Sequence, residues 1–62
     1  MFITLGSNIM ISDDCRFVVR PNAADGTWDV LEIEDKKLQF RATRENRAKA
    51  LDWVNDYRIM NA

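Results

Sequence analysis

The 62-residue sequence has no histidine, one cysteine, two glycines and one proline. Without histidine, neither a serine–histidine nor a cysteine–histidine catalytic pair can form, and a zinc site would need further thiols or imidazoles. Two glycines are too few for a phosphate-cradling loop. Cys15 has no second cysteine to pair with, and on a strand it is expected to be a buried structural thiol. We therefore expect no enzyme, no metal and no cofactor.

Long hydrophobic runs are also missing. No apolar stretch approaches the roughly 18 residues that a membrane-spanning helix needs, so no membrane partner is expected. The N-terminal MFITLGSNIMI has no basic segment and is interrupted by polar residues, which is not typical of a signal peptide. A lone thiol without an export signal favours the cytoplasm. A chain this short buries a modest share of its surface, which favours stabilisation by association with another chain.

What is present indicates a single α+β domain over residues 1–62, with an antiparallel sheet of three to five strands in a meander. Turn-forming residues separate apolar segments. The predicted strands are residues 2–5, 8–12, 15–20, 27–34 and 37–42. Pro21 is expected to end the third strand, because proline cannot donate to a sheet ladder.

The last third of the chain has helical periodicity and predicts one helix over residues 44–60, with Thr43 as its N-cap. At 100° per residue one side of this helix is apolar and would lie on the sheet. That side comprises Ala50, Leu51, Trp53, Val54, Tyr57 and Met60.

The segment TWDVLEIED, residues 27–35, carries apolar residues on both faces of its strand. A turn at Asp35 and Lys36 would pair Leu31 with Phe40, Ile33 with Leu38 and Glu34 with Lys37. We expect the helix to cover the face that holds Leu31, Ile33, Leu38, Phe40 and Ala42. Trp28 and Val30 leave two alternatives: a β-bulge near Asp29 turns them inward, or they stay outward as a patch for a partner.

The net charge of −1 conceals a partition. Residues 1–35 have two basic side chains against seven acids, whereas residues 36–49 have six against one. Arg44 and Arg47 would lie near the helix start, where the macrodipole disfavours cations. Together with Arg41 and Lys49 they suggest an anionic partner; the alternative is a solvated charged face that pairs within the chain.

Residues 17–57 contain a Val-x-Pro strand, a Gly-x-Trp-x-Val strand, a third strand and a helix that begins at a threonine and has spaced alanines. The matching residues are Val19, Pro21, Gly26, Trp28, Val30, Thr43, Ala48 and Ala50. This pattern resembles the small bacterial and phage domains of unknown function known as the DUF2188-like group, and the resemblance implies a fold rather than an activity. The layout also resembles the arm-binding domains of phage integrases, which read DNA with the sheet face opposite the helix. Glu32 and Glu34 on that expected face argue against DNA, because phosphate contact needs a basic surface.

The sequence thus predicts a small non-enzymatic binding module for protein–protein interaction and self-association as a homodimer. A phage or prophage accessory protein fits its size. The alternative is nucleic-acid binding through residues 36–49. The predicted partner-binding residues are Trp28, Val30, Arg41, Arg44, Arg47 and Lys49.

Overall fold

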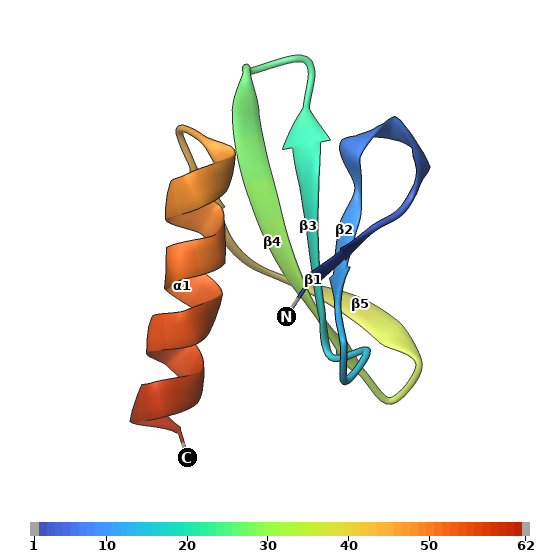
Figure 1. Cartoon of the computed structure of the whole chain (residues 1–62), viewed down its shortest axis with the longest axis vertical. Helices are drawn as coiled ribbons and strands as arrows, with labels where there is room; N and C mark the ends of the chain where they lie inside the picture. Colours follow the sequence, from blue (N-terminus) through green and yellow to red (C-terminus); the bar gives the residue numbers. More distant parts are fainter. Residues whose placement is uncertain (1, 62) are drawn as a thin grey trace.

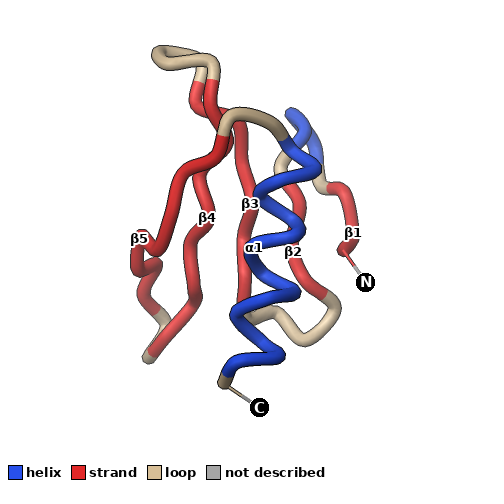
Figure 2. The backbone as a smooth tube through the Cα atoms, turned by 90° about the vertical axis from the view of Figure 1, so that its left-hand side faces the viewer, coloured by secondary structure: helices blue, strands red, loops and turns tan. Residues whose placement is uncertain are grey.

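The computed structural model describes residues 2–61, in which five antiparallel strands form one sheet and a single helix packs on it (Figures 1 and 2). The sheet is a meander of order β1-β2-β3-β4-β5. Its elements are β1 (Phe2–Thr4), the short 3-10 turn η1 (Gly6–Asn8), β2 (Met10–Ser12), β3 (Phe17–Asn22), β4 (Thr27–Glu34), β5 (Lys37–Arg44) and α1 (Arg47–Met60). The predicted α+β fold, an antiparallel sheet packed on one C-terminal helix, is confirmed.

The β4–β5 hairpin has the turn and the register that the sequence predicts. Asp35 and Lys36 have φ values of 52° and 65°, and two positive φ values in a two-residue loop are the signature of a type I′ turn. Glu34 lies opposite Lys37, and the same register continues as far as Leu31 and Phe40.

Pro21 does not end its strand, contrary to the prediction. β3 runs on to Asn22, and Pro21 lies opposite Trp28 on β4. The reason is that β2 is short and pairs with β3 only through Met10 and Ile11. Beyond them β3 is an edge strand, and the missing proline N–H removes no ladder hydrogen bond on that side.

A β-bulge interrupts the β4–β5 pairing. Val30 lies opposite Ala42, but the next residue, Leu31, lies opposite Phe40, which leaves Arg41 as an extra residue on β5. The bulge is therefore on β5, and not near Asp29 on β4, where one of the two alternatives placed it. An extra residue reverses the alternation of side chains along its strand. Ala42 consequently joins Val30 on one face of the sheet, while Phe40 stays with Leu31 on the other.

The hydrophobic core lies between α1 and the sheet face that carries Val30. Its buried members are Phe17, Val19, Val30, Ala42, Ala50 and Val54, with Phe2, Met10, Trp28, Leu51, Trp53 and Tyr57 packed around them. The predicted helix-covered face held Leu31, Ile33, Leu38, Phe40 and Ala42. The prediction is wrong for all of these residues except Ala42, which lies in the core. Both faces of β4 are apolar, so the helix position depends on β3, whose large aromatic Phe17 points to α1.

The helix starts later than predicted. Asn46 is the N-cap, and its side-chain oxygen accepts a hydrogen bond from the Lys49 N–H at 2.9 Å. Thr43, the predicted cap, belongs to β5 together with Arg44. Asparagine caps a helix at least as well as threonine. Thr43 and Arg44 can therefore belong to β5 without lowering the stability of the helix start. The predicted apolar side of α1 is confirmed except for Met60, which is exposed at its last turn.

The predicted strands 8–12 and 15–20 begin two residues later, at Met10 and Phe17. Cys15 therefore lies in the β2–β3 turn, where it has a φ of 60° and an exposed side chain. The prediction of a buried thiol is wrong, because the turn needs a residue with positive φ at this position and turns lie on the surface.

Candidate functional site

A row of apolar side chains crosses the sheet on the side away from α1. The pairing register places these side chains directly opposite one another from strand to strand, in the order Ile3, Ile11, Val18, Leu31 and Phe40. We call them the outer row. Ile33 and Leu38, which are paired with each other, extend it along β4 and β5. We call the whole set the outer face.

Nothing in residues 2–61 covers the outer face. All five strands belong to the sheet, and α1 packs on its other side, in front of the sheet in Figure 2. The two ends of the outer row are the most open: Ile3 is 55% exposed and Phe40 is 60% exposed, and Leu38 beside Phe40 is 52% exposed. Leu31, flanked on both sides, is only 5% exposed. The result is a broad apolar surface with protruding margins.

Among the described strand residues on this side of the sheet, the charged side chains lie at the end next to the β3–β4 turn. Arg20 and Asp29 are opposite each other on β3 and β4, and Asn22 donates a hydrogen bond to the Asp29 carboxylate at 3.5 Å. The apolar part of the outer face contains no ionisable group. It can therefore be covered without removing a charge from water.

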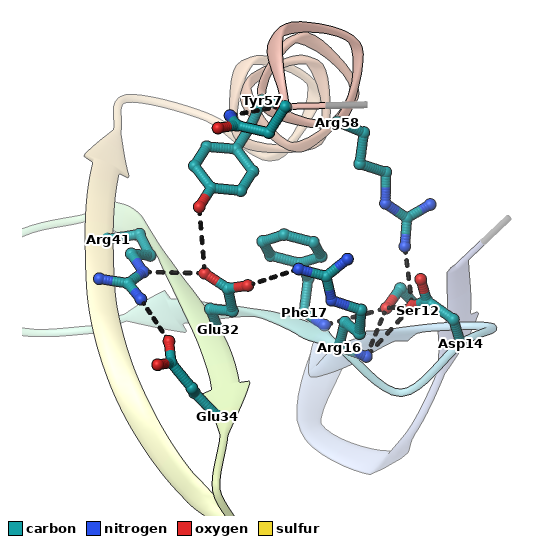
Figure 3. Close-up of polar contacts among 10 residues, drawn as sticks. Ser12, Asp14, Arg16, Phe17, Glu32, Glu34, Arg41, Tyr57 and Arg58 are labelled. Carbon is teal, nitrogen blue, oxygen red and sulfur yellow. Dashed lines mark hydrogen bonds and ion pairs between the residues drawn. The ribbon is translucent and has the colours of Figure 1, made fainter.

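A polar cluster lies on the other side of the sheet, at the C-terminal end of α1 (Figure 3). Its centre is Glu32 on β4, whose side chain is 6% exposed. Arg16 donates to one carboxylate oxygen at 2.8 Å, and Arg41 Nε donates to the other at 3.0 Å. The Tyr57 hydroxyl donates to that second oxygen at 3.5 Å. The bulge explains the geometry, because it turns Arg41 to the side of Glu32.

The Glu32 carboxylate is held ionised by its partners. Burial is the largest single influence on the pKa of Glu32 and would raise it, but the hydrogen bonds and charges of Arg16 and Arg41 together outweigh burial and lower the pKa. Arg41 also reaches Glu34, at 3.0 Å. A carboxylate already surrounded by donors and held ionised is a poor general acid or base for a substrate.

A shallow pocket of about 260 Å³ adjoins this cluster and is lined by Asp14, Arg16, Tyr57, Arg58 and Asn61. Its charges are paired within the chain: Arg58 donates to Asp14 at 2.8 Å, and Arg16 binds Glu32. The Ser12 hydroxyl also donates to Asp14 and is the main cause of the lowered Asp14 pKa. Both arginines lie over the Phe17 ring. These contacts fix the helix end to the β2–β3 turn.

The predicted partner-binding residues lie at three separate places. Val30 is completely buried and Trp28 is half-buried, both on the side of α1. They face inward because α1 covers their side of the sheet, and not through a bulge near Asp29. Arg41 is bound to Glu32 and Glu34, and Lys49 forms an ion pair with Glu45. Arg44 and Arg47 make no ion pair within residues 2–61.

The residues that sequence reasoning missed are those of the outer face. The sequence predicts the pairing of Leu31 with Phe40 and of Ile33 with Leu38, but it places these residues on the sheet face that the helix covers. The signal that would have found the row is the alternation in RFVVR, where Val18 must point away from Phe17 and Val19. Val18, the apolar residue of β3 that points away from the other two, then indicates a second apolar face.

Searches among family models, curated proteins and solved structures find no match to the chain. No helix within the described part of the chain is long and apolar enough to cross a membrane. Across residues 2–61, no group of three or more histidine, cysteine, aspartate or glutamate side chains could hold a metal ion.

Proposed function

We propose that this protein is a non-enzymatic protein-binding module that acts through the outer face. The observation that carries the proposal is the outer row, which spans all five strands and ends in the exposed side chains of Ile3 and Phe40. Soluble domains rarely leave a continuous apolar surface of this kind uncovered unless something binds there. Aromatic and branched apolar side chains, with charge confined to the rim, are typical of the core of an interface.

The polar cluster supports a structural role rather than a catalytic one. Glu32, Asp14 and their arginine partners satisfy one another between the sheet and α1. The Ser12 hydroxyl, which donates to Asp14, is completely buried and accepts a hydrogen bond from the Phe17 N–H, and Cys15 is in a turn on the surface. The cluster therefore holds the fold that presents the outer face.

Photo-crosslinking tests this proposal. Benzoylphenylalanine would replace Phe40 on the outer face in one variant and Ile59 in a matched control, because Ile59 is 75% exposed but lies on the helix. Irradiated with the purified chain and with cell lysate, the position-40 variant is expected to form a covalent adduct with a protein, and the position-59 variant is not. Absence of adducts from position 40, or equal yields from both positions, would contradict the proposal.

A second candidate is nucleic-acid binding through residues 36–49. Arg44 at the end of β5 and Arg47 in the first turn of α1 favour it, because neither guanidinium is paired with a carboxylate in residues 2–61. Binding of labelled DNA should then weaken steeply with salt and should weaken further in the variant Arg44→Ala/Arg47→Ala. Binding that is absent at low salt would exclude this candidate.

A further inference from the structure

We infer that the partner of the outer face is a second copy of this chain, packed sheet against sheet about a two-fold axis with α1 on the outside of each copy. The inference rests on the proposed function and names its partner. Two sheets packed in this way lie about 10 Å apart and interdigitate their inner side chains. The dimer would be a four-layer arrangement of helix, sheet, sheet and helix.

The charge distribution of the outer face suits a partner identical to itself. A two-fold interface brings the same surface patch of both copies together, so a patch of one charge sign would repel itself. The outer face avoids this, because its apolar part has no ionisable group. At its far end Arg20 and Asp29, one of each sign, are opposite each other on neighbouring strands. A basic or an acidic partner would find no opposite charge excess here.

The size of the face also agrees with a dimer. The molecule measures 32 × 21 × 20 Å, so its broad side fits within about 670 Å², somewhat less than the roughly 800 Å² that each partner buries in a standard interface. A small ligand would cover only a part of the outer row. The pocket lined by Asp14 and Arg58 belongs to the polar cluster on the other side of the sheet.

The sheet edges direct association to the face. β1 is three residues long, and β5 has the bulge at Arg41 together with basic side chains at both of its ends. Short strands, bulges and edge charges are the features that prevent edge-to-edge strand pairing. The outer face has no such protection, since Phe40, Leu38 and Ile3 protrude at its margins.

The test is the mass of the full chain in sedimentation equilibrium from micromolar to millimolar concentration. We expect a reversible dimer. Phe40→Asp should raise its dissociation constant by at least about tenfold, because it places a carboxylate in the apolar surface that both copies bury. Ile59→Asp, on the exposed helix end, should leave it unchanged. Because Phe40 is largely exposed in the monomer, the variant should keep its circular dichroism spectrum.

Two results would overturn the inference: a monomer at every concentration, or a dimer that Phe40→Asp leaves intact. A monomer whose position 40 still crosslinks to a different protein would overturn the second copy alone and leave the proposed function standing. A monomer without any adduct would overturn both.

Discussion

Leu31 and Phe40 lie directly opposite each other on the outer side of β4 and β5, yet Leu31 is 5% exposed and Phe40 is 60% exposed. Leu31 has a neighbour on each side, Val18 and Phe40, whereas β5 is the edge strand of the described sheet and Phe40 has a strand beside it only on the side of Leu31. The outer face therefore stabilises the isolated chain less than the core under α1 does. Measurements of stability can distinguish the contributions of the two faces of the sheet.

Two valines on neighbouring strands provide the first comparison. Val30 is completely buried under α1, whereas Val18 is half-buried on the outer face. Val30→Ala should lower the free energy of unfolding by about 2 kcal/mol, because it leaves a cavity in the core, and Val18→Ala by less than about 1 kcal/mol. Urea denaturation of dilute protein measures both. A larger loss at Val18 would mean that the helix covers the other face, and equal losses would mean that both faces are covered.

Glu32 should make the stability of the fold depend on acid. Its pKa in the folded chain is lowered, so the ionised carboxylate stabilises the native state above the ordinary glutamate pKa of about 4.3, and this contribution is lost as the pH falls through the lower folded value. Glu32→Gln should lower the free energy of unfolding at neutral pH by about 1–3 kcal/mol. Thermal unfolding at several pH values should show a weaker acid dependence in this variant.

The control for Glu32 is Glu34→Gln, since Glu34 is exposed and its ion-pair partner within residues 2–61 is Arg41. Its loss should change stability by less than about 1 kcal/mol. Part of the acid dependence should persist in Glu32→Gln, because the pKa of Asp14 is also lowered, chiefly by the Ser12 hydroxyl. Glu32 and Glu34 variants with the same pH profile would contradict the central place of Glu32 in the cluster.

The β4–β5 turn is strained at Lys36, which has a φ of 65°. Glycine adopts this conformation without steric cost, and Asp-Gly is a preferred type I′ pair. Lys36→Gly should raise the free energy of unfolding by about 0.5–1 kcal/mol. Lys37→Gly, one residue further and inside β5, should lower it, because glycine weakens a strand. A chemical denaturation series distinguishes them, and a destabilising Lys36→Gly would refute the turn assignment.

The sequence was informative where the local signal was strong. Asp35-Lys36 fixed the hairpin register from Glu34–Lys37 to Leu31–Phe40, and the apolar spacing from Ala50 to Tyr57 gave the buried side of α1. The side-chain pattern did not predict the bulge at Arg41, since no feature of KLQFRATR indicates that one of its residues is left out of the strand pairing. The bulge at Arg41 decides which face of the sheet Ala42 joins. Without it, the sequence pattern does not show which face α1 covers.

The helix start shows a related difficulty. Thr43 and Asn46 are both good caps, and the choice between them depends on how far β5 must extend to pair with Asp29 and Trp28. Such non-local pairing is not visible in a local pattern. The candidate site was missed for the same reason, because an apolar residue on a two-sided strand does not reveal which side is covered.

The most direct test of the outer face as the binding surface is a dilution series followed residue by residue in ¹H–¹⁵N NMR spectra of the chain. Concentration-dependent shifts are expected at Ile11, Val18, Leu31 and Phe40, with the amides of α1 unchanged. Spectra that are independent of concentration would contradict self-association, and shifts confined to α1 would place the interface on the helix instead.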